Sequence, residues 1–173
     1  VQQAREQRRT RLFAVFVLGL MVLSSVGYAF LSNPGEDALV VPPTGTVVQE
    51  GERYVALVDG QRLSFAYPPE AVANISINGT MSLADYSLAN LYLVGKSAGT
   101  EELAGVLKWY AARMQPACYG VCTENLPEKN CSDLLLIWQP EAPERVYQEE
   151  KCVFIGGSLR SVDAFLYHIL DLK

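Results

Sequence analysis

Short apolar runs and polar–apolar alternation predict a set of β-strands beyond residue 52. Residues 53–67 read RYVALVDGQRLSFAY, where two alternating runs flank Asp59-Gly60, and this pattern predicts a hairpin with a tight turn. Residues 88–95 (LANLYLVG) and 134–139 (LLLIWQ) are short, mainly apolar segments, which predict buried strands. Residues 145–155 are predicted as a further strand that is irregular near its middle.

Two segments carry helical periodicity. The first begins at Thr100, which offers an N-cap hydroxyl, and we expect it to continue until Pro116 stops it. Its apolar residues recur at helical spacing, at Leu103, Val106, Leu107, Tyr110, Ala111 and Met114. The second helix opens at Gly156-Gly157 and Ser158. The order hairpin, β, α, β, β, α predicts a small α/β (α+β) sandwich, with a mixed sheet and about two helices on one face.

The longest uncharged stretch precedes all of these elements. Residues 12–31 read LFAVFVLGLMVLSSVGYAFL, and a helix of this length spans about 30 Å, the thickness of a bilayer core. Residues 1–11 carry four arginines against one glutamate, so the positive-inside rule predicts a cytoplasmic N-terminus and an extracytoplasmic remainder. We interpret residues 12–31 as a retained transmembrane helix. The alternative is a signal peptide cleaved after Ala29, which leaves the domain on the same side.

The sequence after this helix divides into a linker and one domain. Residues 32–52 are predicted as a linker because Asn33-Pro34-Gly35 and Pro42-Pro43 break regular structure, and residues 53–173 as an extracytoplasmic domain. The whole chain has a net charge of −5. An acidic domain repels phosphate backbones, so nucleic acid is not expected as a partner. The basic head is expected to lie against anionic head groups, which makes the lipid bilayer the first predicted partner.

The chain has four cysteines, Cys118, Cys122, Cys131 and Cys152, all within its last third. An even number of cysteines outside the cytoplasm favours two disulfides. Four cysteines allow three pairings, and the sequence does not decide among them. We prefer Cys118–Cys122, which closes a small loop, together with Cys131–Cys152, which ties a loop to the strand that follows it.

Two other roles for these cysteines are weaker. A thiol–disulfide oxidoreductase usually has two residues between its cysteines at a helix N-terminus, whereas three residues separate Cys118 from Cys122 and the pair follows a predicted helix. A zinc site with four thiolates needs two close pairs of cysteines, and only this pair is close.

Three Asn-X-Ser/Thr sequences mark candidate N-glycosylation sites at Asn74, Asn78 and Asn130. They make up three of the six asparagines in the chain. Such sites are meaningful only on a chain that crosses a membrane, so they support the predicted topology.

No catalytic constellation stands out. The single histidine, His168, is expected as a partly exposed residue of the last helix, and neither a cofactor nor a metal ion is expected. Gly156-Gly157 lacks the lysine and serine of a phosphate loop. A hydrolase or ligand-binding site that forms only in three dimensions is a further alternative. Aromatic residues available for such a pocket are Tyr92, Trp109, Tyr110, Tyr119 and Trp138.

The chain combines an arginine-rich head with the apolar segment FAVFVLGLMVLSSVGYAF and the later stretch NCSDLLLIWQPEAPERVYQEEKCVFIGGSLRSVDAFLYHIL. This combination resembles uncharacterised single-pass membrane proteins of archaea, with a weaker likeness over RLSFAYPPEAV. That group has no assigned activity, so the resemblance implies a place in the cell envelope and no catalytic residue.

The sequence therefore predicts a membrane-anchored, extracytoplasmic interaction or assembly module of the cell envelope. It is expected to be non-catalytic and to bind other envelope proteins or itself. The first alternative is an envelope thiol–disulfide oxidoreductase that uses Cys118 and Cys122.

Overall fold

The predicted hairpin is part of a three-stranded antiparallel sheet in the computed structural model, which describes residues 45–95 and 98–173. The strands β1 (Val47–Glu50), β2 (Arg53–Val58) and β3 (Gln61–Phe65) pair in chain order. Asp59 and Gly60 have φ angles of +50° and +76°, as a type I′ turn requires, so the hairpin prediction is confirmed. Because β1 lies within the segment predicted as linker, strand pairing starts ahead of residue 53.

A second, seven-stranded mixed sheet has the order β4-β9-β10-β8-β5-β6-β7. Strands β10, β8, β5 and β6 run parallel to one another, and β9 is antiparallel to β10. The small α/β domain with a mixed sheet is therefore confirmed, whereas the hairpin forms a sheet of its own. The strands of the large sheet are β4 (Ser76–Asn78), β5 (Asn90–Val94), β6 (Arg113–Tyr119), β7 (Glu128–Lys129), β8 (Leu135–Gln139), β9 (Arg145–Glu149) and β10 (Cys152–Gly156).

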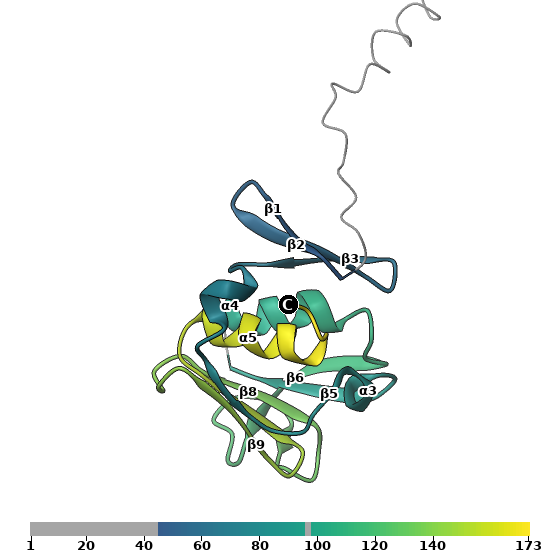
Figure 1. Ribbon diagram of the computed structural model, residues 1–173. Helices are drawn as coiled ribbons and strands as arrows, with labels where there is room; N and C mark the ends of the chain where they lie inside the picture. Colours follow the sequence, from purple (N-terminus) through teal and green to yellow (C-terminus); the bar gives the residue numbers. More distant parts are fainter. Residues whose placement is uncertain (1–44, 96–97) are drawn as a thin grey trace, which may run out of the picture. The chain divides into compact units, whose positions relative to one another are not determined.

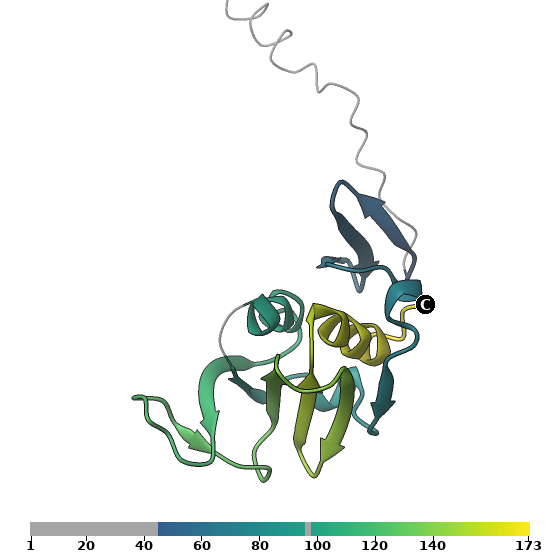
Figure 2. The same cartoon turned by 90° about the vertical axis from the view of Figure 1, so that its left-hand side faces the viewer.

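Two helices, α4 (Ala98–Leu107) and α5 (Leu159–Ile169), lie side by side between the two sheets (Figure 1 and Figure 2). The expected start of α5 is confirmed, because the Ser158 hydroxyl accepts a hydrogen bond from the backbone N–H of Arg160. The main hydrophobic core fills this middle layer. It includes the buried side chains Leu63, Phe65, Leu91, Leu103, Leu136, Ile155 and Phe165. The single-turn helix α2 (Pro69–Val72) connects the two sheets, and a second one, α3 (Leu83–Tyr86), joins β4 to β5 within the large sheet.

The expected extent of α4 is wrong. The helix ends at Leu107, and residues 113–119 form strand β6, which pairs with β5 along its length. Pro116 lies inside β6 rather than at a helix end. Every second backbone N–H group of a strand points to the same side, and those of Cys118 and Gly120 point toward β7. The nitrogen of Pro116, two residues before Cys118, therefore faces that side too, but β7 does not extend as far as Pro116. A proline is tolerated there because no neighbouring strand needs its missing N–H.

The predicted single strand over residues 145–155 is also wrong. It is a hairpin of β9 and β10 joined by a two-residue turn at Glu150-Lys151, where Glu150 has a φ of +51°. The irregularity expected near its middle is the turn itself.

The head, the predicted transmembrane helix of residues 12–31, the cleavage point after Ala29 and most of the linker lie outside the described residues. Within the ranges that the structure does describe, no helix has the length and apolar character needed to cross a bilayer.

Candidate functional site

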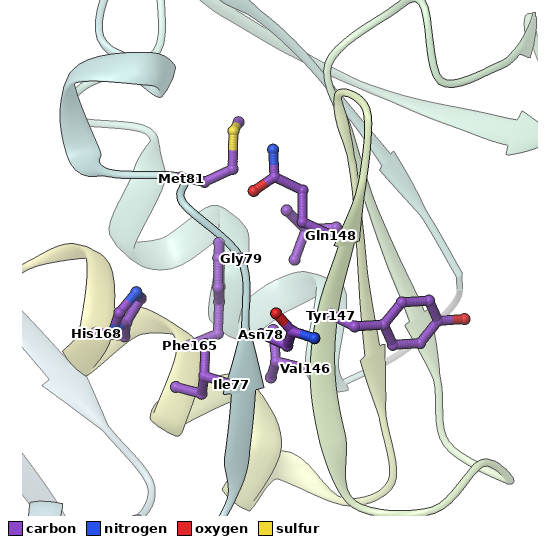
Figure 3. A pocket seen from close by; sticks show the side chains of 10 residues that line it. Ile77, Asn78, Gly79, Met81, Val146, Tyr147, Gln148, Phe165 and His168 are labelled. Atoms are coloured by element: carbon purple, nitrogen blue, oxygen red, sulfur yellow. The ribbon is translucent and has the colours of Figure 1, made fainter.

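The two faces of the large sheet differ in what covers them. Both α4 and α5 pack on one face, and in the described part of the chain no helix packs on the other (Figure 2). Figure 3 shows Val146 and Tyr147 of β9 on opposite sides of the strand, with Tyr147 pointing away from His168 of α5. We call the helix-free side the open face, defined by Tyr92, Val94, Ile137, Tyr147 and Phe154.

The open face carries a row of aromatic rings. Phe154 stacks on Tyr147 with a ring-centroid distance of 4.9 Å and an interplanar angle of 9°. Tyr119 meets Phe154 edge-on at 5.6 Å. Phe154 is 5 % exposed, whereas Tyr119 is 44 % exposed, so the outer end of the row is accessible. Aromatic side chains of this kind are enriched at protein interfaces.

Residues 118–133, which we call the disulfide segment, cross this face. Disulfides join Cys118 to Cys122 and Cys131 to Cys152, the pairing preferred from the sequence. Cys152 is fully buried in β10, so the second bond fastens the segment to the sheet. Near it, the Tyr119 hydroxyl oxygen lies 3.9 Å from the Cys131 sulfur.

The Cys118–Cys122 bond holds a three-residue loop at the end of β6. The loop is further fixed by hydrogen bonds from the Gly120 N–H to the Lys129 carbonyl at 3.1 Å and from the Cys122 N–H to a Glu128 carboxylate oxygen at 3.1 Å. Gly120 has a φ of +77°, which most other residues adopt only with strain. This loop holds Val121 with its side chain 91 % exposed.

A groove of about 500 Å³ lies beside this loop, at the carboxyl ends of β5 and β6. Its apolar lining comes from both strands and from the disulfide segment: Val94, Pro116, Ala117, Val121 and Leu126. The volume falls within the range of ordinary ligand pockets, roughly 300–1,000 Å³. The groove therefore has room for one or two side chains of another molecule.

Two cations border the aromatic row. The ammonium group of Lys129 lies 4.2 Å from the centroid of the Tyr92 ring and 3.2 Å from an Asp133 carboxylate oxygen. A hydrogen bond to Tyr92 and another to Asp133 raise the pKa of Lys129, which keeps it charged. The Arg145 guanidinium lies 4.8 Å from the Tyr147 ring centroid. Both cations thus rest on aromatic faces.

The three sequon asparagines are all exposed, but they lie in different places. Asn130 belongs to the disulfide segment, and its side-chain oxygen accepts hydrogen bonds from the N–H and hydroxyl of Ser132. Asn78 lies in β4, and Asn74 lies just before that strand and accepts a hydrogen bond from Arg160. Glycosylation at these positions stays a prediction.

The crevice usually used by open α/β sheets lies at the carboxyl ends of the strands, near the helix N-termini. Here the protein's own side chains fill the part of it at the end of β8 and the start of α5. The Trp138 indole packs against Gly99 in the first turn of α4 and donates a 3.0 Å hydrogen bond to the Gly157 carbonyl. Glu144 accepts hydrogen bonds from Ser158 and Arg160 at the start of α5, where an anion would otherwise bind.

His168 lines a small cavity between α5, β9 and the segment after β4, opposite Met81 and Gln148 (Figure 3). Its volume of about 10 Å³ suits one water molecule at most. His168 is exposed, as expected from the sequence. Among the described residues, no group of three or more His, Cys, Asp and Glu side chains is arranged to hold a metal ion.

The aromatic residues considered for a common pocket are spread over three places. Tyr92 and Tyr119 lie on the open face, Trp138 lies beneath α4, and Trp109 and Tyr110 follow α4. Sequence reasoning missed Tyr147 and Phe154, because residues 145–155 were interpreted as one strand. Recognising a hairpin would have placed these two rings opposite each other on neighbouring strands.

No family model, curated protein or solved structure matches this chain.

Proposed function

We propose that this chain is a membrane-anchored, extracytoplasmic interaction module of the cell envelope, and that its open face binds a segment of another envelope protein. The observation that carries the proposal is Val121, 91 % exposed on a disulfide-closed loop beside a 500 Å³ apolar groove. Val121 and the groove together offer an apolar surface of the kind that forms the buried core of a protein interface.

The predicted placement rests on three features of the sequence. The uncharged segment of residues 12–31 has the length of a membrane span, and the arginines before it favour a cytoplasmic N-terminus. The two disulfides support an oxidising compartment for the domain. The resemblance to archaeal single-pass membrane proteins supports the same placement.

The partner we propose is a protein segment that inserts an apolar side chain into the groove. The loop around Val121 is already ordered by a disulfide and by hydrogen bonds from two of its backbone N–H groups, so binding loses little conformational entropy. Self-association is less favoured, because residues 45–173 contain 10 Lys and Arg against 16 Asp and Glu, a net charge of −6, and two copies repel each other.

Photo-crosslinking in native membranes tests this proposal. A photoreactive amino acid is placed at position 121 and, as a control, at the exposed position 150 in the β9–β10 turn, followed by mass spectrometry. We expect one discrete protein to be crosslinked from position 121 and not from position 150. The purified partner should then bind the full-length protein at least about 10-fold more weakly after Val121→Asp.

Leu88→Asp is the matched control for that substitution, because Leu88 is another exposed aliphatic residue, at the opposite ends of β5 and β6. It should leave partner affinity unchanged. Equal crosslinking from positions 121 and 150 would contradict the proposal. If the sole crosslinked product were a dimer of this chain, the groove would serve self-assembly rather than binding of another envelope protein.

A thiol–disulfide oxidoreductase remains the second candidate, because the exposed Cys118–Cys122 loop is accessible to a substrate. Two contacts disfavour it. Cys118 ends a strand rather than starting a helix, and the charged side chain bonded to Cys122 is a carboxylate, which does not stabilise a thiolate. Insulin reduction by the purified protein would establish this activity, and a bond that resists glutathione would exclude it.

A further inference from the structure

Leu88 is an exposed apolar residue in a backbone conformation that leucine rarely adopts. Its side chain is 85 % exposed and its φ is +58°. A backbone hydrogen bond from its N–H to the Tyr110 carbonyl, 3.0 Å long, holds it in place. This arrangement combines a strained backbone with an aliphatic side chain exposed to solvent, which is unfavourable unless another surface covers the side chain.

Trp109 lies in the segment bonded to Leu88 and is 51 % exposed. The Lys108 ammonium lies 5.0 Å from the Trp109 ring centroid, and Arg113 is exposed four residues further on. Residues 108–113 read KWYAAR, two cations without an acid, in a domain with a net charge of −6. The acidic side chains near this segment are Asp59, whose charge acts on Tyr110, and Glu101 and Glu102, which line one cleft with Lys108 and Trp109. Tryptophan beside basic residues is typical of the lipid–water interface.

Leu88 and residues 108–113, which we call the amino-end patch, lie at the amino ends of the parallel strands β5 and β6. Gly45, the first described residue, lies at this end too. Its N–H bonds to the carbonyl of Leu57, two residues before Asp59, and the charge of Asp59 acts on Tyr110 in the patch. Thirteen residues separate Gly45 from the predicted membrane helix ending at residue 31, a reach of at most about 45 Å. The patch therefore lies where the tether enters the domain.

We propose that the amino-end patch docks on the bilayer that anchors the chain, with Leu88 and Trp109 inserted at the lipid interface and Lys108 and Arg113 at the head groups. Strand β5 is about 17 Å long, so this docking turns the groove beside Val121, at the opposite strand ends, away from the lipid. The inference rests on the membrane anchor of the proposed function, and it adds the surface that orients the domain.

The full-length protein in vesicles tests this, because its two tryptophans report separately. Vesicles of phosphatidylcholine, with and without phosphatidylglycerol, are prepared with brominated acyl chains, which quench nearby indoles. Trp138→Phe leaves Trp109 alone, and Trp109→Phe leaves the half-buried Trp138 as the control. We expect brominated lipid to remove roughly half of the Trp109 emission, more with phosphatidylglycerol, and little of the Trp138 emission. If Trp138→Phe fails to fold, the quenching of Trp109 is obtained instead as the difference between the emission of the wild type and that of Trp109→Phe.

Leu88→Asp should abolish the quenching of Trp109, whereas Val121→Asp should leave it unchanged. Aspartate tolerates positive φ better than leucine, so the first substitution removes the apolar contact without adding backbone strain. Equal quenching of the two tryptophans would overturn the docking proposal while leaving the Val121 interface intact. Protein that fails to float with the vesicles would overturn both this inference and the predicted anchor. Because the vesicles contain no second protein, a protein partner at the patch cannot produce the expected signal.

Discussion

Asp163 accepts a 2.7 Å hydrogen bond from the backbone N–H of Tyr67, although the aspartate is fully buried. The same carboxylate oxygen accepts a 2.9 Å bond from the N–H of Ala66, and the Tyr167 hydroxyl donates to the Tyr67 carbonyl at 2.7 Å. Two side chains one turn apart on α5 therefore hold the point where β3 leads into α2. The second oxygen of Asp163 has no hydrogen-bond partner among the described residues.

This buried carboxyl group predicts that the domain is less stable at high pH. Burial raises the pKa of Asp163 to about 7, and the negative charge of Glu102 acts in the same direction. The two N–H bonds and Arg53 only partly oppose this rise. Because the unfolded pKa is about 3.9, the folded protein binds the proton more tightly. The stabilisation is complete below about pH 4 and is lost as pH rises through 7, a loss of roughly 4 kcal/mol at most.

Urea unfolding of the wild type and of Asp163→Asn at pH 5 and pH 8 measures this effect. Asparagine keeps the carbonyl oxygen that accepts both N–H groups, so the variant should fold and lose most of the pH dependence. Glu101→Gln, an exposed acid of α4, should leave the dependence as it is in the wild type. An identical pH dependence in the wild type and Asp163→Asn would contradict the prediction.

Much of the fold is visible in the sequence where a local signal is strong. The Asp59-Gly60 turn, the apolar runs of β5 and β8, and the Ser158 cap all stand out, because each depends on residues close in the chain. The β9–β10 turn was missed because Glu150-Lys151 contains neither the glycine nor the asparagine that favours positive φ.

Strand β6 was missed because its signal is tertiary. Tyr110, Ala111 and Met114 continue the helical spacing of α4, and Pro116 is a standard helix terminator. What makes this segment a strand is its pairing with β5, and what permits Pro116 is its place at an incompletely covered edge. Neither can be read from local pattern.

The cysteines were identifiable from the sequence, but the surface they build was not. Their even number and predicted compartment favoured two disulfides. The rigid exposure of Val121 and the row formed by Tyr119, Phe154 and Tyr147 depend on which strands become neighbours. These features appear only when the disulfide segment is folded across the sheet.

Gly99 and Gly105, both in α4, provide an internally controlled test of packing. A Cβ atom at Gly99 would overlap the Trp138 ring, whereas a Cβ at Gly105 meets nothing within 4 Å. Gly99→Ala should therefore destabilise the domain by about 1–3 kcal/mol through overpacking. Gly105→Ala should stabilise it by about 0.5–1 kcal/mol, because alanine favours the helix. Urea unfolding of both variants gives the comparison, and a shift of the same sign in both would show that Trp138 does not close the crevice.

Arg160 links α5 to two other parts of the chain. Its guanidinium donates to the Ala71 carbonyl at 2.6 Å, to the Asn74 side chain at 3.0 Å and to Glu144 at 2.9 Å. A lysine ammonium group lacks the planar set of donors of a guanidinium and cannot reach all three partners. Arg160→Lys should therefore lower the free energy of unfolding by about 1–2 kcal/mol. Arg145→Lys, at an exposed cation–π contact, should cost less than about 1 kcal/mol. Equal losses in denaturant unfolding would mean that the α2 contacts of Arg160 contribute nothing.

The two disulfides should differ in what their removal costs. Cys131–Cys152 spans 21 residues and Cys118–Cys122 spans 4, and the chain-entropy model assigns them about 3 and 2 kcal/mol. Cys131→Ser with Cys152→Ala should lose more stability still, because Cys152 packs in the cluster with Leu135, Ile137 and Phe154.

Cys118→Ser with Cys122→Ser should keep the fold but free the Val121 loop. That variant should then bind the crosslinked partner about 10-fold more weakly, since ordering the loop now opposes binding. If the folded Cys118→Ser, Cys122→Ser protein bound the partner with undiminished affinity, the disulfide would only stabilise the fold and the partner would bind elsewhere.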